Sequence, residues 1–141
     1  MIAVLDTNVL VSGLISPAGP PGRIVDWLRA GTLEPAVDDR ILAEYAQVLR
    51  RPYFLRYFTE TEREDVLRYL HTGAHAFEVH TLASTLPDPQ DACFLEVAIE
   101  SGAPLVTGNL RHFPAKLRHG AQVFTPAEFV AHAAPRLRRN S

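Results

Sequence analysis

Short apolar runs alternate along the chain with longer segments in which apolar residues recur every three or four positions. The runs predict buried strands at 2–5, 34–37, 77–80, 104–107 and 122–124. The longer segments predict helices, with the clearest apolar faces at 23–30, 41–49, 66–74 and 94–99. Residues 9–16 predict a short helix or a loop, because glycine and proline interrupt the pattern there. The alternation indicates an α/β fold, a three-layer α/β/α sandwich whose central sheet is mostly parallel, as in Rossmann-like folds.

Polar residues mark where these helices begin. Asp38 or Asp39 can cap the helix over 41–49. The helix over 66–74 has two candidate capping boxes, Thr59 with Glu62 and Thr61 with Glu64. The segment TPAE at 125–128 predicts the start of a last helix, and Gly102 predicts the end of the preceding one.

The length of 141 residues suits one domain, and no repeat or linker divides the chain. We therefore expect a single domain over 1–141, with a flexible tail from about residue 135. The lone Cys93 excludes a disulfide framework and a paired-cysteine metal site. No apolar run approaches the roughly 18 residues of a membrane span, and the first residues do not resemble a signal peptide. We expect a cytoplasmic protein with no membrane partner.

Charge is distributed unevenly along the chain. Residues 1–110 carry 8 basic and 15 acidic side chains, whereas residues 111–141 carry 6 basic and 1 acidic. The net charge of -2 argues against a protein that coats nucleic acid by bulk charge. The asymmetry permits an acidic metal site beside a separate basic strip, although the basic residues at 136–140 also suit a solvated tail.

Carboxylate and amide side chains follow the predicted strands. Asp6 comes directly after the first strand, Asn109 follows the strand at 104–107, and Asp88 and Asp91 lie in the first turn of the helix before that strand. In a parallel sheet Asp6 and Asn109 lie at one edge, and the helix start can bring Asp91 over it. Such oxygen donors favour Mg²⁺ or Mn²⁺ over zinc. Helix capping is the alternative for Asp88 and Asp91, because helix N-termini favour negative charge.

Four motifs together resemble one known family. They are VLDTNVLVSGL at 4–14, RILAEYAQVLRRP at 40–52, DPQDACFLEVAIESGAPLVTGNLRHF at 88–113 and VFTPAEFV at 123–130. In this order and at these distances they are similar to the PIN-domain ribonucleases, in particular the VapC-like toxin components of bacterial toxin-antitoxin systems. The resemblance covers nearly the whole chain and implies a PIN-like form of the α/β fold.

The resemblance also implies a set of site residues. Asp6, Glu44 and Asp91 would be acidic metal ligands with a catalytic role, and Asn109 takes the position where relatives have aspartate or asparagine. Because asparagine offers a neutral carbonyl, a second metal ion is less favoured than the first. Asp88 would bind a second ion or cap its helix. The residues suited to orienting these ligands are Thr7, Asn8 and Thr107.

The implied activity is that of a metal-dependent endoribonuclease that cuts single-stranded or exposed RNA with one or two Mg²⁺ or Mn²⁺ ions. Arg111 and His112 are candidates for contacting the RNA backbone, the alternative being a solvated pair. The resemblance also implies a homodimer and a small antitoxin protein that occludes the acidic site.

Two other functions compete with this one. A haloacid-dehalogenase-type phosphatase or a phosphoacceptor receiver needs a lysine near the phosphoryl group, and the chain's single lysine, Lys116, lies late among KLRHG. A catalytically weak PIN-like domain that acts as a protein- or RNA-binding module is the second alternative. The survival of Asp6, Glu44 and Asp91 argues against a degenerate site.

Two further features have competing interpretations. RRPYFLRYF at 50–58 interleaves arginines with aromatic rings, which suits an interface or an RNA-stacking surface, although core packing accounts for at least two of the rings. His71 and His75 have a spacing that can chelate a metal on a helix, but Thr72 and Gly73 favour a helix end there instead.

Overall fold

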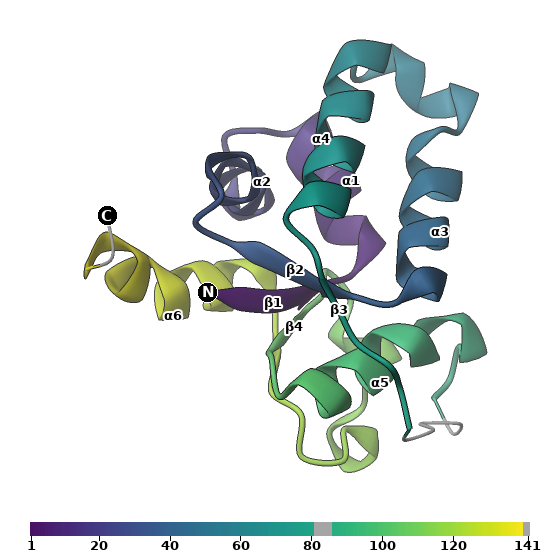
Figure 1. Ribbon diagram of the computed structural model, residues 1–141, viewed down its shortest axis with the longest axis vertical. Helices are drawn as coiled ribbons and strands as arrows, with labels where there is room; N and C mark the ends of the chain where they lie inside the picture. The colour runs from purple at the N-terminus through teal and green to yellow at the C-terminus, as the bar shows by residue number, and fades with distance from the viewer. Residues whose placement is uncertain (81–85, 140–141) are drawn as a thin grey trace.

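The computed structural model describes residues 1–80 and 86–139, which form a parallel sheet flanked by helices (Figure 1). The sheet has five strands in the order β3-β2-β1-β4-β5, and each neighbouring pair is parallel. The strands are β1 (Ile2–Leu5), β2 (Glu34–Val37), β3 (His75–Ala76), β4 (Leu105–Val106) and β5 (Val123–Phe124). The predicted α/β fold with a parallel sheet is confirmed.

Helices connect the strands and cover both faces of the sheet. They are α1 (Thr7–Ile15), α2 (Pro20–Ala30), α3 (Asp39–Leu49), α4 (Glu60–Thr72), α5 (Ala92–Ser101) and α6 (Pro126–Arg139). Short 3-10 turns lie at η1 (Pro52–Arg56), η2 (Pro89–Asp91), η3 (Leu110–His112) and η4 (Ala115–Leu117). In Figure 1, α5 lies below the sheet while α1, α2 and α4 lie above it, which gives the three layers predicted from the sequence.

The capping residues fix where the helices begin. Of the two candidate caps for α3, Asp38 is the one used, and it accepts a 3.0 Å hydrogen bond from the backbone of Ile41. Thr59 and Glu62 form the capping box of α4. A second reciprocal pair starts α6, where Glu128 and Thr125 each accept from the other's backbone N–H. These local signals were readable in the sequence, because each cap needs only residues three positions apart.

The strand predicted at 77–80 was wrong, because the third strand of the chain lies at His75–Ala76. It pairs with the end of β2, and the backbone of Phe77 donates a last hydrogen bond to Val37 at 2.9 Å. Beyond Val37 the chain turns into α3, so residues 78–80 have no strand to pair with. The backbone of His80 donates instead to the carboxylate of Glu100 on α5.

The C-terminal end of α4 confirms that a helix ends between His71 and His75. The helix ends at Thr72, and His75 lies in β3, so His71 and His75 share no helical face. His75 contacts the carboxylate of Glu34 on the neighbouring strand.

The C-terminal segment continues α6 through the region where we expected a flexible tail. The helix runs to Arg139 with Pro135 inside it, and Leu137 is buried. Residues 140–141 of the expected tail lie outside the described residues.

The aromatic segment after α3 divides into buried and exposed rings. Phe58 is buried and stacks with the half-buried Phe54, so these two rings belong to the core. Tyr53 and Tyr57 are 56% and 45% exposed, and the Arg56 guanidinium lies 4.8 Å from the centre of the Tyr53 ring. For the exposed rings, an interface or RNA-stacking role stays a prediction.

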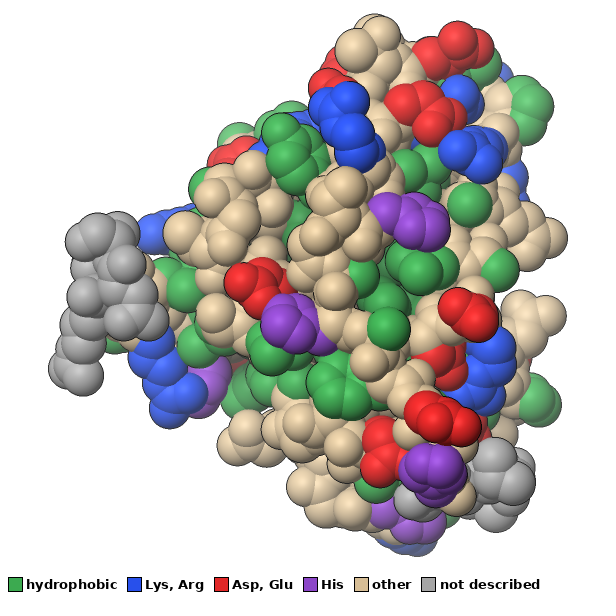
Figure 2. All heavy atoms as spheres, in the orientation of Figure 1, with side chains coloured by type: hydrophobic (Ala, Val, Ile, Leu, Met, Phe, Trp, Pro, Cys, Tyr) green, Lys and Arg blue, Asp and Glu red, His purple; other side chains and the backbone are tan. Residues whose placement is uncertain are grey.

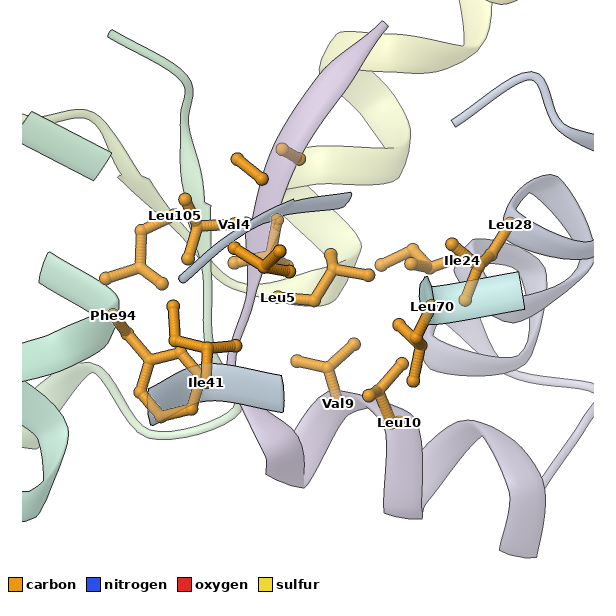
Figure 3. Close-up of a cluster of buried hydrophobic side chains, with 14 of the residues drawn as sticks. Val4, Leu5, Val9, Leu10, Ile24, Leu28, Ile41, Leu70, Phe94 and Leu105 are labelled. Carbon is orange, nitrogen blue, oxygen red and sulfur yellow. The ribbon is translucent and has the colours of Figure 1, made fainter. Parts of the chain in front are cut away.

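The hydrophobic core joins the sheet to the helices on both faces (Figure 3). Val4 and Leu5 of β1 are completely buried and lie among side chains of α1, α2, α3 and α5. This packing fixes the carboxyl end of β1, and the acidic residues begin at that end. Within the described part of the chain, no helix is long and apolar enough to span a membrane.

Candidate active site

Asp6 lies at the carboxyl end of β1 and is only 5% exposed. It occupies the N-cap position of α1, yet its side chain makes no capping hydrogen bond. Its Oδ2 atom instead accepts a 2.9 Å bond from the Thr107 hydroxyl and a 3.3 Å bond from the Asn8 side-chain amide. The carboxylate is therefore held toward the ends of β1 and β4.

Burial raises the pKa of Asp6 to about 6, because the charged form loses its hydration. The hydrogen bond from Thr107 opposes this shift, whereas the charges of Asp91 and Glu44 add to it. The same three carboxylates that the resemblance identified are thus close enough to repel one another.

Glu44 comes from α3 and is half-buried. Its Oε2 atom accepts a hydrogen bond from the hydroxyl of Thr7, at the first residue of α1. The next residue, Tyr45, is completely buried and donates a 2.5 Å hydrogen bond to the carbonyl of Leu5. These two bonds attach α3 to the end of β1 and place Glu44 near Asp6.

Arg40 attaches the same helix to α5. Its guanidinium lies 2.7 Å from Asp38 and 2.8 Å from Glu96, a side chain that is almost fully buried. Figure 2 shows acidic and basic side chains next to one another at the lower right of this face. Because Asp91 immediately precedes α5, the Arg40 contacts help to fix the position of Glu44 relative to Asp91.

Asp88 and Asp91 behave differently although both lie at η2. Asp88 caps the turn and accepts a 3.0 Å hydrogen bond from the backbone of Gln90. Asp91 makes no capping bond to α5 and is only 8% exposed. Its Oδ2 atom is buried and has its close polar contact with His112. The helix-cap interpretation therefore accounts for Asp88 but not for Asp91.

His112 of η3 lies against Asp91. Its Nδ1 atom is 2.8 Å from Asp91 Oδ2, which is ion-pair distance for a protonated ring, but the two groups are not aligned for a hydrogen bond. Burial raises the pKa of Asp91; the charge of His112 opposes that shift, and the charges of Asp88 and Glu44 add to it. The ligand atoms of Asp88, Asp91 and His112 all lie within 4.8 Å of one another.

The structure places the remaining predicted residues around this edge. Asn8 accepts a 3.0 Å hydrogen bond from the backbone of Gly108, in addition to its contact with Asp6. The backbone of Asn109 donates to the Thr107 hydroxyl at 3.1 Å, so the threonine connects Asn109 to Asp6. Arg111 is exposed on η3. Thr7, Asn8 and Thr107 thus each contact a predicted ligand or its backbone.

These residues suit a hard divalent cation. Asp6 and Asp91 are buried carboxylates of raised pKa, and Asp91 Oδ2 has an unused lone pair. In the described ranges 1–80 and 86–139, no lysine or arginine lies within ion-pair distance of Asp6, Glu44 or Asp91. Their mutual repulsion is the feature that a bound cation would relieve.

Residues 3–111 match the family model of the PIN domain. The chain belongs to the PIN domain family. The matched segment includes Asp6, Glu44, Asp91 and Asn109, and His112 lies one residue beyond it. An uncharacterized protein of Methanocaldococcus jannaschii is 30% identical over 107 residues, which cover 75% of this chain and 69% of that protein.

A solved structure has a similar fold. The crystal structure of VapBC2 from Rickettsia felis, bound to a DNA fragment from its promoter, contains a chain that superposes on this PIN domain with a TM-score of 0.56. The alignment covers 89% of this chain and 98% of that chain, at 16% sequence identity. At this identity the match shows a shared fold.

The sequence alone did not reveal two features of this PIN domain. From the sequence, His112 was a candidate for RNA contact or a solvated residue, and its contact with Asp91 depends on how η3 folds back toward η2. The close approach of Asn8 to Gly108 was also missed, although the glycine is a signal in hindsight. A Cβ atom on Gly108 would lie 3.3 Å from the Asn8 Oδ1 atom, which is tighter than most such contacts.

Proposed function

We propose that this PIN domain is a metal-dependent endoribonuclease that hydrolyses RNA phosphodiester bonds with Mg²⁺ or Mn²⁺. The observation that carries this proposal is the juxtaposition of two buried carboxylates, Asp6 and Asp91, neither of which forms an ion pair with a lysine or arginine of the described residues. A purely structural role would not favour two such charges at one edge of a sheet.

Asp6, Glu44 and Asp91 would hold the ion, with Asn109 as a neutral oxygen donor and Asp88 as a candidate for a second ion. When bound, such an ion acidifies an attacking water and offsets the negative charge of the phosphate. Thr7, Asn8 and Thr107 keep the ligands in place through the hydrogen bonds described above. Arg111 and His112 of η3 would contact the RNA backbone beside the ion.

The proposal is tested by incubating the purified protein with a labelled single-stranded RNA and a structured RNA in Mg²⁺, in Mn²⁺ and in EDTA. We expect internal cuts with either ion and none in EDTA. Cleavage that persists in EDTA would contradict the metal dependence. RNA binding without cleavage in either ion would favour the binding-module alternative.

We also propose that the enzyme is the toxin of a toxin-antitoxin pair, forms a homodimer and is inhibited by a small antitoxin. The VapC-like fold and the resemblance of the four motifs support this role. The test is to co-express the chain with the product of the adjacent reading frame. A stable complex that suppresses both cleavage and growth arrest is expected, and light scattering of the isolated chain measures its oligomeric state.

A further inference from the structure

A polar groove extends from the candidate active site between α3 and the start of α5. It has a volume of about 420 Å³, within the roughly 300–1,000 Å³ of pockets that hold small organic ligands. Glu44 lies in one wall and the segment from Pro89 to Cys93 forms the other. Glu44 is also a proposed metal ligand, so the groove adjoins the candidate metal site at that residue.

One wall of the groove presents an evenly spaced row of polar side chains. Arg40, Glu44 and Gln47 recur every three or four residues along α3, and Arg51 continues the row just beyond the helix end. That spacing places them on one face of the helix. From Arg40 to Arg51 the row covers about 16 Å at 1.5 Å per residue. The row therefore continues past Glu44, away from the proposed metal site.

The two arginines of this row differ in the charge that they offer. Arg40 is engaged by Asp38 and Glu96, which offset its positive charge. Arg51 is exposed and forms no ion pair with any residue of the described chain. Its guanidinium is thus available to an anion that lies in the groove. A phosphate next to the one at the metal site is such an anion, because arginine binds phosphate through paired N–H groups.

Apart from Arg40, Glu44 and Arg51, the polar side chains that line the groove are uncharged. Gln47 and Gln90 approach it from opposite walls, one on α3 and the other in η2. Side-chain amides carry both donors and acceptors, so they are able to hydrogen-bond the edge of an unpaired base. Cys93 and Val48 add apolar surface beside them.

We infer that this groove holds the nucleotide next to the scissile phosphate of a single-stranded RNA, with Arg51 on its phosphate and Gln47 and Gln90 on its base. This inference rests on the proposed function and adds the direction in which the substrate strand leaves the metal site. Arg51 determines affinity for any sequence, whereas the two glutamines determine sequence preference.

The experiment measures binding without cleavage. Fluorescein-labelled uridine and adenosine oligoribonucleotides are titrated in EDTA with the wild-type chain and with Arg51→Gln, and anisotropy gives the dissociation constants. We expect Arg51→Gln to weaken both complexes roughly tenfold, as loss of a hydrogen bond to a charged group does. The slope of log K against log salt should fall by about 0.7, the value for one contact with a single strand.

Arg29→Gln is the matched control, because Arg29 is an exposed arginine near the end of α2, away from this groove. It should leave both constants unchanged. Gln47→Leu and Gln90→Leu should change the ratio of the two affinities and leave the salt slope unaltered.

The outcomes separate this inference from the proposed function. Unchanged binding in Arg51→Gln, or equal weakening by Arg29→Gln, overturns the groove assignment even if the wild-type chain cuts RNA in Mn²⁺. Weakened binding confined to Arg51→Gln supports the assignment even if no cleavage is found, in which case only the catalytic proposal fails.

Discussion

The Thr107 hydroxyl donates a 2.9 Å hydrogen bond to the buried carboxylate of Asp6, although the two residues are 101 positions apart in sequence. The parallel pairing of β1 with β4 makes this contact, because each residue follows directly after its strand. The backbone of Asn109 donates to the same hydroxyl, so one threonine orders two of the predicted site residues. Thr107 is completely buried, and its hydroxyl contacts both Asp6 and the backbone of Asn109.

We predict that Thr107→Val lowers the affinity for Mn²⁺ by roughly 10- to 100-fold, the usual cost of losing a group that orients a metal ligand. Valine has the same shape but cannot donate to Asp6, and the pKa of Asp6 should rise further because the Thr107 bond lowers it. Isothermal titration calorimetry measures the affinity. Thr107→Ser keeps the hydroxyl and serves as the control, and equal affinity in the valine variant would refute an orienting role.

Asp6→Asn should abolish RNA cleavage while leaving the fold intact. The amide oxygen can still accept from Thr107 and Asn8, but it brings no negative charge to a metal ion. Gel-based cleavage assays measure the activity, and circular dichroism checks the fold. Undiminished Mn²⁺-dependent cleavage by the variant would contradict the assignment of Asp6 as a metal ligand.

The packing of α1 against α2 depends on two glycines. A Cβ atom on Gly22 would lie 2.0 Å from the carbonyl oxygen of Pro17, and one on Gly13 would lie 2.6 Å from that of Pro21. Both obstacles are backbone atoms, Pro17 in the connection between α1 and α2 and Pro21 in α2, so the backbone would have to shift. Because α1 carries Thr7 at its first residue, this packing also supports the position of Glu44.

Gly22→Ala should therefore destabilise the protein by about 1–3 kcal/mol, the usual cost of overpacking. Gly19→Ala is the matched control, because its Cβ atom would meet only the Pro21 ring at 3.7 Å. Urea denaturation of both variants gives the free energies of unfolding. Similar values for the two variants would show that the connection between α1 and α2 shifts easily.

Several elements were predictable because their signals are local. The strands at 2–5 and 34–37 and the caps of α4 and α6 depend on residues a few positions apart, and the structure confirms them. The strand at 77–80 was not predictable in this way. Its apolar alternation is real, but pairing requires a neighbour, and β2 ends at Val37 before those residues are reached.

In the candidate site, too, some features were predictable from the sequence and others depended on the tertiary structure. Asp6 and Asn109 were placed at one edge by strand order, which the sequence pattern predicts. Asp88 and Asp91 have the same chemistry and spacing, and their different roles became visible only once the caps were resolved. The contact between His112 and Asp91 depends on the geometry of two short turns, for which the sequence carries no periodic signal.

The raised pKa of Asp6 predicts a pH-dependent stability of the metal-free protein. Its pKa is about 6 in the folded chain and 3.8 in the unfolded chain, so the folded state binds this proton more tightly. The resulting stabilisation is fully present below pH 3.8 and is lost as the pH rises through 6. The difference of pKa values corresponds to about 3 kcal/mol at most.

Asp6→Asn removes this titration, so in EDTA the variant should be less sensitive to pH between 4 and 7. It should be close to wild type in stability at the acidic end and more stable than wild type at the neutral end. Urea denaturation of both proteins at several pH values measures the difference. Adding Mn²⁺ at neutral pH should then stabilise the wild-type chain, because the ion binds only the folded state, and should have little effect on the variant. Parallel stability curves for the two proteins in EDTA would mean that the charge of Asp6 is already offset by a group other than a metal, and a metal site centred on this residue would lose its physical basis.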